Sequence, residues 1–80
     1  MEIIHAVIEK EVVDCGVWFD EIPNMFAWGE TVDKAKQDAV DVLNSYIETL
    51  KEESQPLPEI LKNDWKIEYR FLKESNINNI

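Results

Sequence analysis

Residues 32–50 carry an apolar pattern typical of a long helix that lies across a sheet. At about 100° per residue, the apolar side chains fall within an arc of about 160°, broader than the seam of a coiled coil. They are Val32, Ala35, Ala39, Val40, Val42, Leu43, Tyr46, Ile47 and Leu50. Thr31 precedes them as the expected N-cap, and Asp33 places an anion in the first turn. On the opposite side of this helix we expect a water-facing acidic ridge of Asp38, Asp41, Glu48 and Glu52.

Four segments have the character of strands and supply the sheet that this helix requires. Residues 3–9 are rich in β-branched side chains. A short polar connection leads to residues 17–22, so we expect the first two strands to run antiparallel. Residues 25–28 form a third, short strand. Residues 65–71 alternate apolar and charged side chains without exception, which is the strongest strand pattern in the chain.

Proline, asparagine and glycine mark the connections between these segments. Pro23 fixes φ and Asn24 tolerates left-handed backbone, which predicts a tight turn between the second and third strands. Gly16 is expected to supply a positive φ in the first connection, and Gly29 to break the third strand. The proline-containing segment 54–58 ends the helix and opens a single helical turn before the last strand.

The order β-β-β-α-β predicts one α+β domain over residues 1–71. We expect two layers, an antiparallel sheet and one long helix on one face, followed by a flexible tail over residues 72–80. A chain of 80 residues buries a thin core. The apolar face of the last strand is therefore expected to support a homo-oligomer, with an interface at Trp65, Ile67, Tyr69 and Phe71.

The charge of the chain bears on its partners. Its net charge is −9, and residues 1–53 hold thirteen acids and four lysines. No segment clusters lysine and arginine as a phosphate-binding surface requires. The aromatic residues could stack nucleic-acid bases, but without basic neighbours we expect them to pack in the core and at an interface. An acidic protein of this kind suits a basic protein partner.

Few residues carry catalytic or metal-binding chemistry. His5 and Cys15 are each the only residue of their type, and the pairing of the first hairpin should hold them apart. A zinc site needs about four ligands, so we expect no metal and no cofactor. The many carboxylates leave a metal-dependent nuclease as a minor alternative. The single cysteine, the lack of a long apolar run and an N-terminus without basic residues predict a cytoplasmic protein, with no membrane partner.

Residues 19–31 resemble a motif of the HicB-type antitoxin family. Members show a Phe-Pro-Asp-Leu-Pro-Gly turn, a short strand and a Gly-Asp-Thr sequence that leads into an alanine-rich helix. The matching residues here are Phe19-Asp20-Glu21-Ile22-Pro23-Asn24, then Gly29-Glu30-Thr31, then Ala35 and Ala39. Residues 7–10 and 56–59 also fit, and the resemblance extends over about residues 3–71. Asp20, Glu21 and Asn24 depart from the family pattern at turn positions.

The resemblance implies a partial RNase H-like fold without catalytic activity. The family's usual activity is to bind and neutralise a small basic HicA-type toxin, an mRNA-cleaving ribonuclease. We place the toxin-binding residues at Asp20, Glu21, Glu30 and Asp33, around the turn and the helix start. The family commonly appends a DNA-binding module, which the nine residues after Phe71 cannot hold. Either the sequence is truncated or this protein has lost direct operator binding, and from this chain we expect no direct binding of nucleic acid. The alternative is an orphan HicB-like regulatory or protein-interaction module without a toxin partner.

Overall fold

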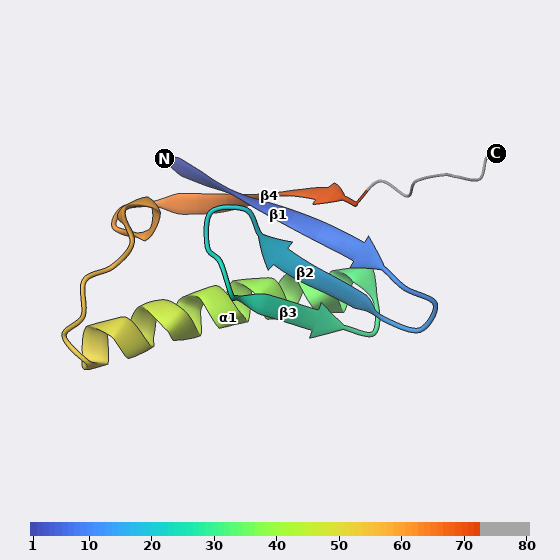
Figure 1. Cartoon of the computed structure of the whole chain (residues 1–80), viewed down its shortest axis with the longest axis horizontal. Coiled ribbons are helices and arrows are strands. Elements are labelled where there is room, and N and C mark those ends of the chain that lie inside the picture. The colour runs from blue at the N-terminus through green and yellow to red at the C-terminus, as the bar shows by residue number, and fades with distance from the viewer. Residues whose placement is uncertain (73–80) are drawn as a thin grey trace.

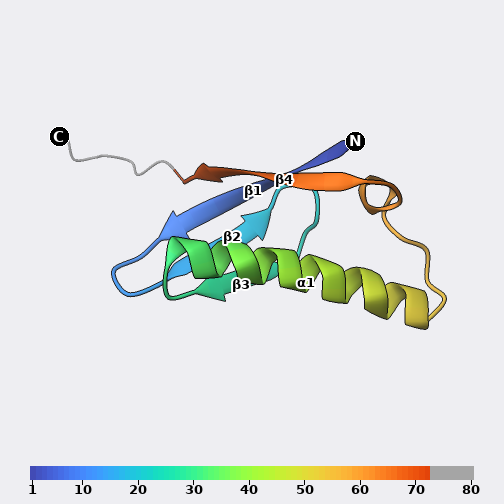
Figure 2. The same ribbon diagram turned by 180° about the vertical axis from the view of Figure 1, so that it is seen from behind.

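The computed structural model describes residues 1–72, so most of the predicted tail lies outside the described part of the chain. Its elements are β1 (Glu2–Lys10), β2 (Cys15–Phe19), β3 (Phe26–Gly29), α1 (Val32–Glu52), the 3₁₀ turn η1 (Glu59–Leu61) and β4 (Trp65–Phe71). The four strands form one sheet in the order β3-β2-β1-β4. The helix α1 lies across one face of this sheet (Figures 1 and 2). The predicted α+β class, the element order and the two layers are confirmed.

The sheet is mixed, which corrects the prediction of an antiparallel sheet. β2 pairs antiparallel with both β1 and β3, whereas β4 runs parallel to β1, with Glu2 opposite Trp65 and Ile8 opposite Phe71. The length of α1 explains this difference. Its 21 residues rise about 31 Å, which is about the length of β1. The helix therefore returns the chain to the end of the sheet where β1 begins, and β4 starts from there.

The start of α1 is anchored to β3 by small residues. Thr31 is the N-cap, as predicted, and its Oγ1 accepts a hydrogen bond from the Lys34 N–H at 3.1 Å. Ala35 and Ala39 are fully buried against the sheet. β3 ends at Gly29, which is the last residue of the strand rather than the first residue after it. A Cβ at Gly29 would lie 2.3 Å from the backbone nitrogen of Ala35, so glycine allows the helix to approach this strand.

The end of α1 also follows the sequence pattern. The helix stops at Glu52, and Ser54 adopts a left-handed φ of 55°. The Ser54 N–H donates to the Lys51 carbonyl, and the Gln55 N–H donates to the Leu50 carbonyl at 2.8 Å. These bonds satisfy carbonyls of the last helical turn that have no partner within the helix. The predicted single helical turn after residue 58 is η1.

The core lies between α1 and the helix-facing side of the sheet. Three strands contribute alternate residues to it, and α1 contributes one stripe. The fully or almost fully buried members are Ile4, Ala6, Ile8, Cys15, Val17, Phe19, Ile22, Ala27, Ala35, Ala39, Leu43 and Leu61. Three residues of β4, Trp65, Ile67 and Tyr69, pack against this cluster and are half-buried. The core is thus complete over β1, β2 and β3 and thinner under β4.

Two further predictions about β2 are corrected. This strand ends at Phe19 rather than at residue 22. Beyond Phe19 the next residue of β1 that would pair with β2, His5, bonds to one backbone group and one side chain instead of to a full pair of backbone groups. The His5 carbonyl accepts from the Asp20 N–H at 2.9 Å, and the His5 N–H donates to Glu21 Oε1 at 2.8 Å. A carboxylate thus replaces the next backbone acceptor. Gly16 lies within β2 and does not have a positive φ, whereas Asn24 has a φ of 65°, as its turn position predicted.

Candidate protein-interaction surface

The face of the sheet opposite α1 carries a group of exposed aromatic rings. We call Trp18, Phe26 and Trp28 the aromatic platform. Phe26 is 60% exposed and Trp28 is 50% exposed, while Trp18 is half-buried. Trp18 lies directly opposite Phe26 in the β2–β3 pairing. Figure 1 looks onto this open face, and Figure 2 looks onto α1 from behind. Within residues 1–72 no helix or loop covers these rings as α1 covers the other face.

One ring of the platform is held by a hydrogen bond, and another lies over a glycine. A Cβ at Gly16 would lie 2.7 Å from Cζ of Phe26, so the glycine leaves the space that this ring fills. Trp28 Nε1 donates a hydrogen bond to Asp14 Oδ2 at 2.9 Å. An exposed ring that is already oriented, as Trp28 is, loses little conformational freedom when a partner binds. This property favours a binding role for the platform.

Asp38 is bound to the strand that carries the platform. Its Oδ2 accepts a hydrogen bond from the backbone N–H of Trp28 at 2.9 Å. This contact corrects the prediction that Asp38 belongs to a water-facing ridge of α1, because the side chain is half-buried beside β3. The contact also satisfies one outward-pointing donor on the exposed edge of the sheet.

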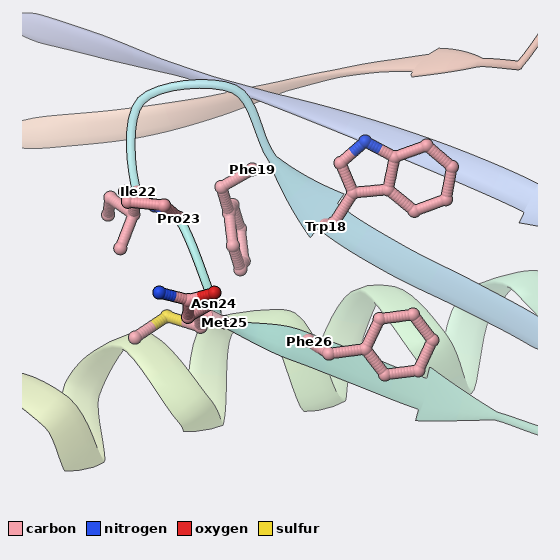
Figure 3. A pocket seen from close by; sticks show the side chains of 7 residues that line it. All are labelled: Trp18, Phe19, Ile22, Pro23, Asn24, Met25 and Phe26. Carbon is pink, nitrogen blue, oxygen red and sulfur yellow. The ribbon is translucent and has the colours of Figure 1, made fainter.

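A shallow hollow adjoins the platform at the turn between β2 and β3. It measures about 530 Å³, and Figure 3 shows its lining side chains. They are Trp18, Phe19, Ile22, Pro23, Asn24, Met25 and Phe26. The lining is mainly apolar, and the turn predicted from Pro23 and Asn24 forms one side of it. An apolar hollow beside exposed aromatic rings can receive an apolar or long aliphatic side chain of a partner.

The other half of the open face is charged. Arg70 Nη1 donates to Asp20 Oδ2 at 2.8 Å, and both side chains remain largely exposed. The Nδ1 atom of His5 is paired with Glu21 Oε2. The hydrogen bond to Glu21, with further attraction from nearby carboxylates, raises the pKa of His5 above 6.5. Partial desolvation opposes ionisation of Glu21, but the hydrogen bonds from His5 outweigh it and lower the pKa of this carboxyl below 4.5.

The structure separates the four predicted toxin-binding acids into two pairs. Asp20 and Glu21 follow β2, at the level where Phe19 pairs with Ala6. Glu30 and Asp33 lie at the start of α1, after Gly29, which pairs with Cys15 at the other end of β2. The two levels are four strand positions apart, or about 14 Å. Asp20 and Glu21 bind side chains of their own chain, and Glu30 lies 3.7 Å from Lys34 Nζ. These acids do not form one patch.

The four residues predicted at an oligomer interface share the helix-facing side of β4, as their alternation implied. Trp65, Ile67 and Tyr69 are half-buried, while Phe71 is 57% exposed. The Tyr69 hydroxyl donates to the Lys36 carbonyl at 3.3 Å, and Lys36 Nζ lies 4.9 Å from the centre of the Tyr69 ring. Burial raises the pKa of Tyr69. β4 is an edge strand, so this apolar face reaches the boundary of the molecule.

The two side chains considered from the sequence as a nucleophile and its base lie on opposite faces of the sheet. His5 lies on the open face and is exposed, whereas Cys15 is buried on the helix side, so the two cannot act as a nucleophile and its base. Among the residues that the structure describes, no three histidine, cysteine or carboxylate side chains come together to hold a metal ion. No helix within residues 1–72 has the length and apolar character needed to cross a membrane.

Comparisons with protein-family models, with curated proteins and with solved structures find no match to this chain. The geometry is therefore the main guide to function. The sequence predicted a strand over residues 25–28, but its aromatic residues were expected to pack in the core and at an interface. The pairs of His5 with Glu21 and of Arg70 with Asp20 were not predicted, because no local pattern links residues 16 and 50 positions apart.

Proposed function

We propose that this chain is a non-catalytic, antitoxin-like protein that binds and neutralises a small basic mRNA interferase of the HicA type. The observation that carries this proposal is the aromatic platform on the open face of an acidic chain. Aromatic anchors are the residues most often responsible for binding energy at protein interfaces. The resemblance of residues 19–31 to HicB-type antitoxins supports the choice of partner. The mixed sheet with one helix is compatible with the fold that this resemblance implies.

The proposed mechanism is occlusion of the toxin's RNA-binding surface. A ribonuclease that holds RNA needs exposed lysine and arginine side chains, since phosphate contacts dominate such binding. Trp18, Phe26 and Trp28 can receive the aliphatic stems and cationic heads of these residues. Asp14 and Asp38, which bind Trp28 in the free protein, place negative charge beside the rings. Basic residues engaged on this surface are no longer available to RNA.

The four acids predicted to bind the toxin differ in how freely they could contact a partner. Glu30 and Asp33 are exposed at the helix start and can contribute long-range attraction to a basic partner. Asp20 and Glu21 bind Arg70 and His5 of the same chain, so reversing their charges also disturbs the fold. A test by reversal of all four acids would mix these effects. Substitutions in the platform give a cleaner test, because two of its rings are largely exposed.

The test is co-expression of the chain with a small basic mRNA interferase of the HicA type, followed by measurement of growth and of binding between the purified proteins. We expect growth rescue by the unmodified chain and its loss with Phe26→Ala plus Trp28→Ala. Phe71→Ala is a matched control, because Phe71 is an equally exposed phenylalanine on the other face. Binding should weaken at least about tenfold with the platform variant and stay unchanged with the control. Absence of a complex with the unmodified chain would refute the antitoxin function.

A further inference from the structure

The two edges of the sheet differ in how well they are protected. β3 is an edge of four residues, and Asp38 takes the N–H of Trp28 on that strand. β4 is an edge of seven residues and contains no proline. Natural sheets usually shorten, cover or interrupt an edge, because a long free edge pairs with other strands. The edge at β4 lacks such protection within the described residues.

The direction of the backbone groups in β4 follows from hydrogen bonds at its two ends. The Glu2 N–H donates to the Asp64 carbonyl at 2.9 Å, and the Leu72 N–H donates to the Ile8 carbonyl at 2.8 Å. Even-numbered positions of β4 therefore bond to β1, and the odd-numbered positions direct their N–H and C=O groups outward. These are Trp65, Ile67, Tyr69 and Phe71. Within residues 1–72, no hydrogen bond joins these outward groups to another segment.

We propose that β4 pairs antiparallel with β4 of a second copy of this chain, about a twofold axis at Ile67. The side chains on the open face select this register. A fully overlapped pair would place Glu68 opposite Glu68 of the second copy and Lys66 opposite Arg70, which are like charges at every position. An axis at Ile67 instead places Lys66 opposite Glu68, and Asp64 opposite Arg70, of the second copy. Each pairing occurs twice in the dimer, which gives four pairs of opposite charge. Within one chain Lys66 Nζ already lies 4.0 Å from Glu68 Oε2, and Arg70 Nη1 already binds Asp20, so in the dimer these side chains share their charge between two partners.

The helix-facing side of the same register is apolar. Trp65 lies opposite Tyr69 of the second copy, and Ile67 lies opposite itself. These residues are half-buried in one chain, and a paired strand would cover their outer sides. Two other registers bring opposite charges together. An axis at Trp65 places Asp64 opposite Lys66, but it sets Asn63 opposite Ile67, and most of β4 then has no strand opposite it because β4 begins at Trp65. An axis at Tyr69 overlaps more of the strand. It offers only the Glu68–Arg70 pair, twice, and sets Lys66 opposite Leu72. The axis at Ile67 therefore pairs more opposite charges on the open face and keeps apolar residues opposite one another on the helix-facing side.

The distribution of charge along the chain permits this contact. Residues 54–80 hold four acids and four basic residues, whereas the excess of negative charge lies in residues 1–53. β4 is thus the part of an acidic molecule where two copies meet the least repulsion. The resulting dimer has one continuous sheet with α1 of both copies on the same side, a form of strand addition. The inference does not rest on the proposed function, because it uses a different surface.

Charge reversal with sedimentation equilibrium tests the register on the full chain. Lys66→Glu and Glu68→Lys should each weaken the dimer at least about tenfold, since each creates two like-charge pairs. An equimolar mixture of the two variants should dimerise again, because all pairs between the different chains are complementary. The double variant Lys66→Glu plus Glu68→Lys should also form a dimer. Lys10→Glu and Glu48→Lys are controls that change the charge equally at exposed sites away from β4.

The outcomes separate the registers. An axis at Glu68 predicts a stronger dimer for Lys66→Glu, and an axis at Tyr69 predicts no change, so either result overturns the proposal. An unmodified chain that remains monomeric at millimolar concentration overturns it as well. A second measurement uses single cysteines in a Cys15→Ser background. Ile67→Cys should form an intermolecular disulfide on oxidation, while Glu68→Cys and Tyr69→Cys should not, because only Ile67 faces its own copy.

Discussion

Gly29→Ala should be among the most destabilising small substitutions in this protein. The added Cβ would lie 2.3 Å from the nitrogen of Ala35, 2.6 Å from the carbonyl carbon of Lys34 and 2.7 Å from Cα of Ala35. All three atoms are backbone atoms of the first turn of α1, so relief requires the helix start to move away from β3. Overpacking of this kind costs about 1–3 kcal/mol, and the rigid neighbour places Gly29 at the upper end. Alanine restores about 0.5 kcal/mol by restricting the unfolded chain.

The net loss is therefore about 2.5 kcal/mol, a large part of the roughly 4–12 kcal/mol expected for 80 residues. Urea denaturation followed by tryptophan fluorescence measures it. With a slope of about 1 kcal/mol per molar urea, the midpoint should fall by about 2.5 M. Gly16→Ala is the matched control, because its Cβ would meet Cζ of Phe26 at 2.7 Å, an exposed ring that can swing away. This control should change stability by less than about 1 kcal/mol. Equal losses in both variants would refute the argument.

Three other changes test different parts of the structure. Nuclear magnetic resonance titration should give His5 a pKa above 6.5 that falls towards this value in Glu21→Gln. In the unmodified chain the His5–Glu21 pair should stabilise the fold most between about pH 4.5 and 6.5. This stabilisation should be lost as pH rises through the raised pKa of His5, or as it falls through the lowered pKa of Glu21. If the difference in unfolding free energy between the unmodified chain and Glu21→Gln did not change with pH, this prediction would be contradicted. Leu43→Ala, at a fully buried site, should cost about 3 kcal/mol in urea denaturation, and a loss below 1 kcal/mol would show that α1 is not packed as described. Thr31→Ala should cost about 1 kcal/mol through loss of the cap, and Thr31→Ser, measured in the same way, should restore most of it.

The helix and its docking were predictable because they depend on local chemistry. The apolar arc of residues 32–50 identified both the length of α1 and the face that it buries. The cap at Thr31 and the left-handed Asn24 follow from properties of single residues. The strict alternation of residues 65–71 predicted β4 to the residue. In each case the controlling interaction lies within a few positions along the chain.

The features that were not predicted depend on residues far apart in the chain. The direction of β4 relative to β1 follows from the length of the intervening helix, which the order of elements alone does not specify. β2 ends early because the Glu21 carboxylate binds the backbone of His5, a contact between different segments. Gly16 and Gly29 lie within strands and have no positive φ. Glycine is needed at these positions because a Cβ would collide with the Phe26 ring at Gly16 and with the start of α1 at Gly29, so their role is close packing. Such contacts exist only after the chain has folded.

The locations of the platform and of the β4 edge lead to a final prediction, that binding of a partner and self-association are independent. The platform lies on β2 and β3, whereas the dimer edge is β4, separated from β2 by β1. In a dimer paired through β4 the two platforms would lie at the far ends of the sheet, both on the open side. Lys66→Glu should therefore weaken the dimer without changing the affinity of one chain for the basic partner. Phe26→Ala plus Trp28→Ala should weaken partner binding without changing the sedimentation of the free protein. If either variant affected both measurements by more than about threefold, the two sites would be coupled, since separated surfaces normally contribute additively.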